Sequence, residues 1–222
     1  MPSTRLPASL LALGLCLTAG CGGDASPTDL IDGSRAPAVP AELTHLGHGL
    51  VMTSAAVVHT GEVADELRAC DPTLHLAPSR PVVRRVGVVT ESLTFRTAPS
   101  GVRGCDRARG AVVETGGKWC GTSVGLVTLG RLRDPRLELC QDRNGRPVAA
   151  FAWIDPVPGT RWIVVDQGDR DEVYPRAGAL PVRIATAVDI DAESASAVFD
   201  YAEYDARGRL IESTTIHPFV AG

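Results

Sequence analysis

The chain has 222 residues, of which 44% are hydrophobic and 22% are charged, and its formal net charge is −4. This composition is too apolar for an intrinsically disordered chain and too irregular for a fibrous one. An acidic chain also lacks the basic balance of a dedicated nucleic-acid binder, so we expect no nucleic acid among its partners.

The first 21 residues have the three-part pattern of a secretory leader. Arg5 and the α-amino group form a short positive region, an apolar run covers residues 6–19, and small residues precede Cys21. The apolar run is shorter than the roughly 20 residues that a transmembrane helix needs. We therefore interpret residues 1–20 as a signal peptide that directs the chain out of the cytoplasm.

The end of this leader, Leu17-Thr-Ala-Gly-Cys21, resembles the lipobox of bacterial lipoproteins, with Thr18 at a position where that family usually has Leu. In that family the cysteine thiol receives a diacylglyceryl group, and cleavage makes the cysteine the first residue. The resemblance implies a lipid on Cys21 that anchors the protein to the cell membrane, facing away from the cytoplasm. The alternative is an ordinary secretory peptide in which Cys21 carries no lipid.

Residues 21–42 are rich in Gly, Ala, Pro, Ser and Asp and show no apolar period, which predicts a flexible, disordered tether. Residues 43–222 are then expected to form a disulfide-bonded β domain. The Pro- and Gly-containing segment 156–159 leaves open a division of this domain into two small β modules.

The expected elements begin with an apolar segment at 49–58, which is compatible with a strand, and a short helix at 61–70, where Val63 and Leu67 lie four residues apart. From residue 81 onward, short apolar runs alternate with Gly-, Pro- and Asp-rich breaks. The runs expected as strands are 81–89, 93–97, 124–129, 137–140, 148–154, 162–165, 182–190, 195–204 and 210–216. No long helices alternate with them. The pattern predicts a mainly β fold, an antiparallel β-sandwich or barrel-like domain with one short N-terminal helix.

Two turns and two aromatic pairs refine this expectation. Asn144-Gly145 is a strong hairpin signal, and the spacing of Asp142 and Gly145 is repeated at Asp205 and Gly208. The aromatic pairs, each on one strand face, are Phe151 with Trp153 and Phe199 with Tyr201. We expect the two pairs to share one interior between packed sheets. The alternative is an exposed binding platform.

Four cysteines remain after the leader and Cys21 are set aside: Cys70, Cys105, Cys120 and Cys140. An even count in an exported domain predicts two disulfides, and four cysteines allow three connectivities. We favour Cys105–Cys120 with Cys70–Cys140. A reactive thiol is the alternative, but no Ser-His-Gly run of the kind found in cell-wall transpeptidases precedes Cys105.

One segment has the spacing of a catalytic serine motif. Residues 121–125 fit G-x-S-x-G around Ser123, and an Asp at 189, 200 or 205 followed by His217 would complete the order Ser, Asp, His. The nucleophile elbow requires a strand, a sharp turn and a helix. Because an apolar, strand-like run follows Ser123, we expect a Gly-rich β-turn instead of an elbow.

Metal sites are weakly indicated. His45 and His48 are three residues apart, but their spacing matches no zinc signature, so exposed histidines are favoured. Acidic residues recur at period two at Asp189, Asp191 and Glu193, but Ser194 stands where an EF-hand loop needs Gly. The acidic run 166–172 is interpreted as a solvated hairpin turn. We expect no metal and no cofactor.

These observations favour a membrane-anchored cell-envelope lipoprotein with a binding or structural β domain whose ligand the sequence does not name. The alternative from another class is a lipid-tethered extracellular hydrolase that uses Ser123 or an acidic pair.

Overall fold

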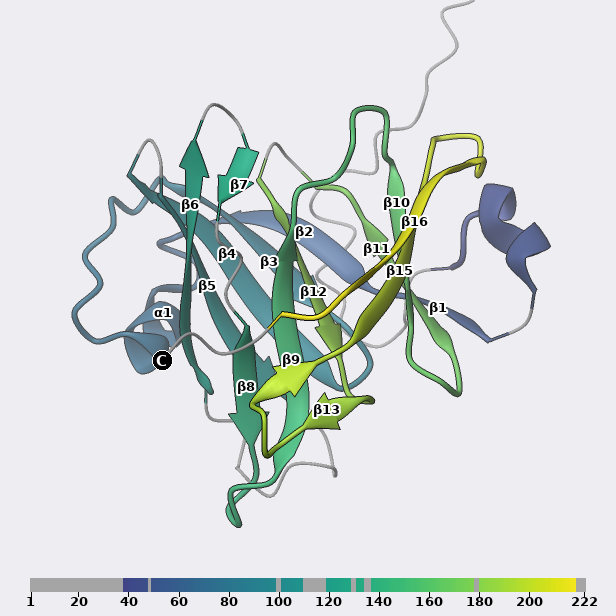
Figure 1. The fold of residues 1–222 in the computed structure, drawn as a ribbon. Coiled ribbons are helices and arrows are strands. Elements are labelled where there is room, and N and C mark those ends of the chain that lie inside the picture. Colours follow the sequence, from purple (N-terminus) through teal and green to yellow (C-terminus); the bar gives the residue numbers. More distant parts are fainter. Residues whose placement is uncertain are drawn as a thin grey trace, which may run out of the picture.

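The structure, a computed structural model, describes residues 38–47, 49–98, 101–109, 119–128, 131–133, 137–177 and 180–218. Within these ranges the protein is mainly β, with several antiparallel sheets packed together, as the sequence predicts (Figure 1). Helical structure in the described part consists of the 3₁₀ helix η2 (Ala41–Leu46) and the α-helix α1 (Ala64–Cys70). Helix α1 confirms the short helix expected at 61–70. The leader, Cys21 and most of the predicted tether lie outside the described residues.

The described strands form three larger sheets and one small one. The six-stranded sheet has the order β2 (Ser54–His59), β3 (Pro81–Val86), β4 (Thr90–Ala98), β5 (Gly101–Ala108), β6 (Gly121–Thr128) and β7 (Arg131–Arg133). The five-stranded sheet has the order β1 (Leu50–Met52), β11 (Asp171–Pro175), β10 (Trp162–Asp166), β15 (Phe199–Tyr204) and β16 (Leu210–Ile216). The three-stranded sheet has the order β12 (Val182–Thr186), β9 (Pro147–Ile154) and β8 (Glu138–Gln141), and β13 (Ile190–Asp191) pairs with β14 (Ser196–Ala197).

The segment expected as a strand at 49–58 is divided between two sheets. Its first part, β1, pairs in parallel with β11, and its second part, β2, pairs antiparallel with β3. Between them, the backbone N–H and the hydroxyl of buried Thr53 both donate to the carbonyl of Val173. The chain therefore joins the five-stranded and six-stranded sheets along one side.

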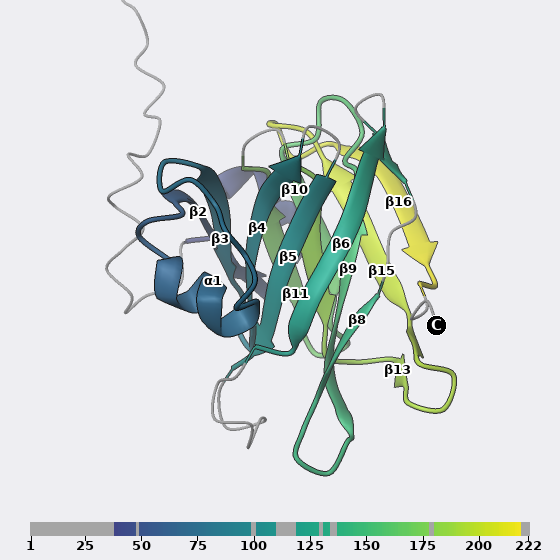
Figure 2. The same ribbon diagram turned by 90° about the vertical axis from the view of Figure 1, so that its left-hand side faces the viewer.

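Strand β9 lies between the two larger sheets, as Figures 1 and 2 show. Its last six residues, 149–154, are all buried, which fits a strand covered on both faces. Ala150, Ala152 and Ile154 pack with residues of β10, β12 and β15. Ala149 and Phe151 face the other way and pack with Ala108 at the end of β5. Strand β9 therefore separates two interiors of the molecule.

The first interior, here called the apolar interior, contains a cluster of buried hydrophobic side chains, including Ile163, Val165, Ile184 and Phe199. Residues from β5, β6, β9 and β12 form the second, here called the polar interior: Asp106, Ser123, Phe151, Trp153 and Arg183.

The two aromatic pairs belong to different interiors. Phe151 and Trp153 are each 1% exposed, so an exposed platform at this face is wrong. Phe199 is fully buried and Tyr201 partly so, both in the apolar interior. The expectation of one shared interior is therefore also wrong, because β9 stands between the two pairs.

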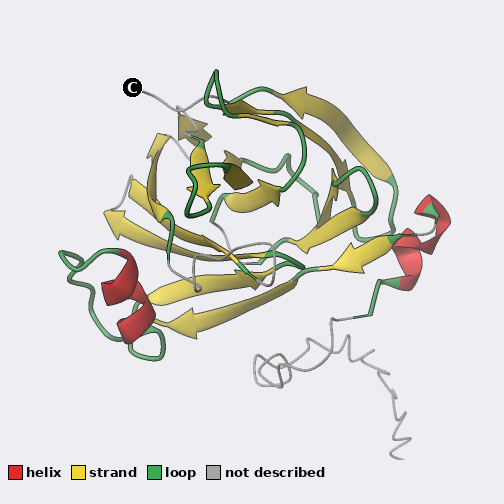
Figure 3. Ribbon diagram, turned by 90° about the horizontal axis from the view of Figure 1, so that it is seen from below, coloured by secondary structure: helices red, strands yellow, loops and turns green. Residues whose placement is uncertain are grey.

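Helix α1 and η2 cover outer faces at opposite ends of the molecule (Figure 3). Val63 and Leu67 of the α1 segment pack on Val82, Leu93 and Phe95 of the six-stranded sheet. In η2, buried Leu43 packs on Met52, Val164 and Val173, and Val39 is partly buried against the same cluster. Residues 39–42, within the range predicted as tether, are therefore part of the folded body.

Two disulfides are present, as predicted, but their pairing differs. Cys70 at the end of α1 is bonded to Cys105 of β5, and Cys120 is bonded to Cys140 of β8. Cys105 faces the outer side of the six-stranded sheet, toward α1, whereas Cys140 packs on the inner side against Ala149. The expected Cys70–Cys140 bond would have to cross that sheet. The expected pairing was wrong because a sequence does not show which face of a sheet a cysteine occupies.

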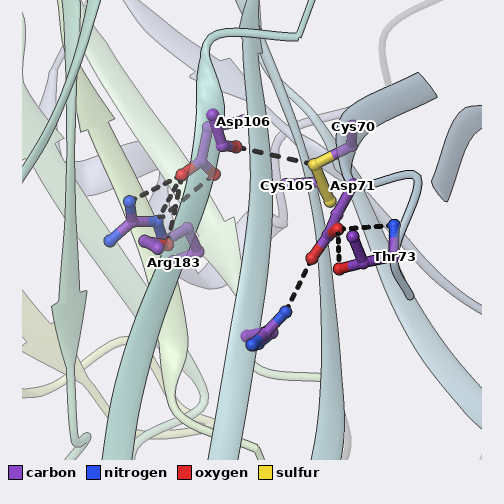
Figure 4. The surroundings of a disulfide bond; sticks show 9 residues. Cys70, Asp71, Thr73, Cys105, Asp106 and Arg183 are labelled. Atoms are coloured by element: carbon purple, nitrogen blue, oxygen red, sulfur yellow. Dashed lines mark hydrogen bonds and ion pairs between the residues drawn. A yellow bond between two sulfur atoms is a disulfide. The ribbon is translucent and has the colours of Figure 1, made fainter. Parts of the chain in front are cut away.

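A carboxylate next to the first disulfide also fixes the end of α1 (Figure 4). Asp71 accepts hydrogen bonds from the backbone N–H and hydroxyl of Thr73, at 2.9 and 2.6 Å, and pairs with Arg103 of β5 at 2.7 Å. The hydrogen bonds from Thr73, followed by the positive charge and hydrogen bond of Arg103, lower the pKa of Asp71.

Strands on both sides of segment 156–159 pair with each other, since β9 precedes it and β12 follows it. The backbone N–H of Val157 and the hydroxyl of Thr160 donate to Glu203, a carboxylate on β15 that is 2% exposed. The segment is therefore a fixed connection between β9 of the three-stranded sheet and β10 of the five-stranded sheet.

The two related turns have the same structure. Asp142 accepts from the backbone N–H groups of Asn144 and Arg146, and Asp205 accepts from those of Arg207 and Arg209. The glycines of both turns have positive φ, 77° at Gly145 and 71° at Gly208, which favours Gly there. The strands that the sequence pattern did not reveal include β5, which contains two glycines and three charged residues, and β11, which begins with two acidic residues.

Candidate functional site

The segment around Ser123 is neither an elbow nor a β-turn. Residues 121–126 are paired with β5 along strand β6, so the chain is extended at Ser123. Its side chain is 4% exposed, and its hydroxyl lies 3.4 Å from a carboxylate oxygen of Asp106. A serine in a regular strand lacks the exposed hydroxyl that the nucleophile elbow provides.

The proposed partners of Ser123 lie elsewhere. Asp189 is in a turn with φ of 50°, Asp200 bonds Thr215, and Asp205 caps the second turn. His217 follows β16 at the edge of the five-stranded sheet. Within the described ranges, no hydrogen bond joins Ser123 to any of these four residues.

The metal candidates that lie among the described residues do not come together as a site. His45 is exposed on η2, and His48 lies outside the described residues. Asp191 accepts hydrogen bonds from Glu193 and Ser194 and so stabilises a turn. No group of three or more His, Cys, Asp or Glu side chains placed to hold a metal ion occurs in the described part of the chain.

The polar interior contains a buried ion pair (Figure 4). Arg183 of β12 donates from Nη2 and Nε to Asp106 of β5, at 2.6 and 3.1 Å, and both side chains are fully buried. Asp106 and Cys105 are neighbours in β5 and point to opposite faces of the sheet, one toward Arg183 and the other toward α1. Such alternation is the regular geometry of a strand.

Aromatic rings and a glycine complete the surroundings of this ion pair. The guanidinium of Arg183 lies over Trp153, 4.8 Å from the ring centre, and over Phe151, 5.7 Å from it. Nη1 of Arg183 has no hydrogen-bond partner among the described residues, and the two ring faces stabilise the guanidinium as a whole. At Gly104 a Cβ atom would stand 2.8 Å from the hydroxyl of Ser123, so only Gly fits.

Glu138 of β8 lies at the border of the polar interior. Burial raises the pKa of Glu138, the negative charge of Asp106 raises it further, and Arg183 partly opposes both effects. Asp106 is fully buried and already bonded to Arg183, so this carboxylate is closed to a substrate, whereas Glu138 is partly exposed. The Asp106–Arg183 ion pair is therefore a structural element of the polar interior.

A pocket of about 350 Å³ lies where turns of the three larger sheets meet. The six-stranded sheet contributes Val89 from the β3–β4 turn. The five-stranded sheet contributes Gln167, Gly168, Asp169 and Arg170 from the β10–β11 turn, and the chain leaving β12 contributes Ala187 and Val188. Mouths and ends of β architectures are common places for small-molecule sites.

Hydrogen bonds hold the pocket walls in place. The side chain of Gln167, 3% exposed, donates to the carbonyl of Ala185 at 2.8 Å and accepts from the N–H of Ala187 at 3.1 Å. Asp166 accepts from the N–H of Gly168, whose φ of 77° favours Gly at this position. The β10–β11 turn and the end of β12 are therefore fixed to each other without a ligand.

Buried polar groups continue from the pocket wall into the molecule. Nη2 of Arg170 lies 3.8 Å from Glu172, which accepts a 2.8 Å hydrogen bond from the hydroxyl of Tyr174. Burial, followed by the charge of Glu172, raises the pKa of Tyr174 well above its ordinary value. Arg85 lies over the Tyr174 ring and donates to the carbonyl of Pro175, and burial lowers its pKa to about 10.

The acidic run 166–172 is therefore only partly the solvated turn that the sequence predicts. The turn is at 167–170, but Asp171 begins β11 and Glu172 is 1% exposed. The acidic run in the sequence predicted the turn itself. Nothing in it indicated that Val89 and Val188, far apart along the chain, would meet this turn.

No family model, curated protein or solved structure matches the chain. Among the described residues, no helix is both long and apolar enough to pass through a membrane.

Proposed function

We propose that this chain is an exported, lipid-anchored cell-envelope protein whose β body binds a small, mainly apolar ligand. The observation that carries the binding function is the pocket formed by turns from all three larger sheets. Its volume, about 350 Å³, is at the small end of the range of ligand sites. A binding protein needs such a site and no catalytic constellation.

The proposal of export and anchoring is supported by the leader and by Cys21 in its lipobox-like context. Two disulfides are also typical of proteins that fold outside the cytoplasm. An acidic body gains no attraction from an anionic lipid surface, so the acyl chains would supply the membrane attachment.

The walls favour an apolar ligand. Val89, Ala187 and Val188 supply aliphatic surface, and Val88, next to the pocket in the same turn, is 47% exposed. Filling the pocket would remove this apolar surface from water, which is the main favourable contribution to binding of this kind.

Binding is tested with 1-hexanol as a small apolar probe, followed by the backbone amide NMR shifts of the full mature protein. We expect saturable shifts at Val89, at the β10–β11 turn and at Val188. Val89→Phe fills the pocket and should abolish them. Val88→Phe, an identical change at the exposed neighbouring position, should leave them intact. Equal responses of the two variants would overturn the site.

Anchoring is tested separately by Cys21→Ser. This change should release the protein from membranes or leave an unprocessed precursor. A Cys21→Ser protein that is processed and membrane-bound like the parent would show that no lipid on Cys21 holds it.

A further inference from the structure

Polar groups in the wall of the pocket are hydrogen-bonded within the protein. The side-chain amide of Gln167 donates to the carbonyl of Ala185 and accepts from the N–H of Ala187. The hydroxyl of Thr186 accepts from the N–H of Val188 and donates to its carbonyl, both at 3.1 Å. A ligand that bonded to these groups would first have to break bonds that the protein already makes, which cancels most of the gain. This wall therefore favours a ligand that needs no hydrogen bond inside the pocket.

The charged side chains at the pocket pair with each other. Nη1 of Arg170 donates to Asp169 at 2.9 Å, and Nη2 lies 3.8 Å from Glu172. The side chain of Asp169 is 75% exposed, so its carboxylate is in contact with water. A polar group of a ligand would lose its own hydration on entering the pocket, whereas it keeps that hydration outside. We therefore expect the polar end of a ligand to remain in solvent.

The apolar part of the lining is aliphatic. Val89, Ala187 and Val188 contribute methyl groups, and none of the described residues that line the pocket is aromatic. Aromatic ligands gain from stacking and edge contacts with other rings, and this lining provides no ring. A methylene group takes about as much space as a water molecule, about 30 Å³, so the pocket of about 350 Å³ holds at most about 12 of them. A single short alkyl chain is enough to fill it.

We infer that the pocket binds the alkyl chain of a single-chain amphiphile, with the hydrocarbon inside the pocket and the polar end in water. The chain is recognised by its length and by its removal from water, and no hydrogen bond joins it to the wall. This inference rests on the proposed binding function, because it concerns the same pocket and names the class of ligand that the pocket takes.

The test compares the affinities of four alcohols by NMR titration. The protein is the mature chain, residues 21–222, with Cys21→Ser, so that neither an attached lipid nor a detergent competes for the pocket. 1-Octanol should bind about tenfold more tightly than 1-hexanol, because two further methylene groups leave water. 1,6-Hexanediol should bind at least about tenfold more weakly than 1-hexanol, because its second hydroxyl would be buried without a partner. 3-Phenyl-1-propanol, an aromatic alcohol of similar hydrophobicity, should also bind more weakly than 1-hexanol.

A pair of matched variants tests whether the wall itself sets this preference. Val188→Thr nearly keeps the shape of the side chain but places a hydroxyl in the wall. It should weaken the binding of 1-hexanol and narrow the ratio between the affinities of 1-hexanol and 1,6-hexanediol. Val88→Thr is the same change at the exposed neighbouring turn position, and it should leave the ratio unchanged. Because the readout is a ratio between probes, a general loss of stability in a variant does not imitate it.

The outcomes separate the inference from the proposed function. If none of the four alcohols shifts the amides of Val89, Gly168 and Val188, the binding function itself is wrong. If 1,6-hexanediol or 3-phenyl-1-propanol binds there as tightly as 1-hexanol, the pocket stands and the alkyl-chain inference is overturned. Equal affinities of 1-hexanol and 1-octanol, or an unchanged ratio in Val188→Thr, would likewise overturn it.

Discussion

The two faces of β9 border interiors of opposite character. On one face, Ala150 and Ala152 meet an interior of Ile, Val, Leu and Phe side chains. On the other, Phe151 and Trp153 meet a fully buried Arg183–Asp106 ion pair. Apolar burial is not directional, whereas an ion pair is satisfied in one arrangement only. The apolar interior therefore supplies stability that tolerates small shifts, and the polar interior penalises any shift of β5 relative to β12.

The largest effect is expected from breaking the ion pair. Asp106→Ala leaves Arg183 buried without a counter-charge and should destabilise the protein by about 3–5 kcal/mol. Replacing both partners, Asp106→Leu with Arg183→Met, should recover most of this loss, because no buried charge remains. Chemical denaturation of the disulfide-intact protein measures both. A cost below about 1 kcal/mol for Asp106→Ala would show that the pair is not buried as described.

Truncating one aromatic ring in each interior compares them directly. Phe151→Ala and Phe199→Ala should each cost about 3–5 kcal/mol, through lost burial and the cavity left behind. Phe151 also lies 5.7 Å from the guanidinium of Arg183, so its removal should cost about 0.5–1 kcal/mol more. The unfolding midpoints of the two variants show which substitution costs more stability. A Phe151→Ala midpoint equal to that of the parent would return this face to the candidate binding surfaces.

A single methyl group added to the polar interior should have a smaller effect. In Gly104→Ala the new Cβ would stand 2.8 Å from the Ser123 hydroxyl and 3.0 Å from Cζ2 of Trp153. Overpacking of this kind costs about 1–3 kcal/mol. Gly61→Ala is the control, since its nearest neighbour would be at 3.4 Å. Equal thermal stability of the two variants would contradict the tight packing at Gly104.

The smallest effect concerns pH. The pKa of Glu138 is raised in the folded protein above its usual 4.5, so the folded state holds this proton more tightly than the unfolded state. Stability should therefore decline as pH rises from about 4.5 toward the folded-state pKa of Glu138. Glu138→Gln should remove this component and be the more stable form at neutral pH. Parallel pH dependences of parent and variant would be the contrary result.

Asp205 serves as an internal control, because its contribution to stability should change with pH in the opposite direction. Hydrogen bonds from the backbone and side chain of Arg209 lower its pKa from 3.8 to about 2. Its contribution is present above pH 3.8 and is lost as pH falls toward 2. Because this partly buried carboxylate is bonded within its own turn, it should not respond to changes in the polar interior.

The sequence by itself determined the features that depend on neighbouring residues. The apolar runs located most strands, Val63 and Leu67 located α1, and the Asp142 and Asp205 turns formed as their spacing predicts. Turn chemistry and side-chain periodicity act within a few residues, so they can be read without knowing the fold. The leader and the lipid on Cys21 remain predictions from the sequence.

Tertiary structure alone decided which residues meet. Arg183 and Asp106 are 77 residues apart, and Cys70 and Cys105 are 35 apart, so their pairing follows from sheet order and from the face that each strand presents. The pocket likewise depends on three turns from three sheets. Strand β5 was missed because its glycines and charged residues interrupt the apolar pattern. Gly104 makes room for Trp153, and Asp106 binds Arg183. Glycines and charged residues that serve a contact with a distant part of the fold interrupt the apolar alternation by which a strand is recognised in a sequence.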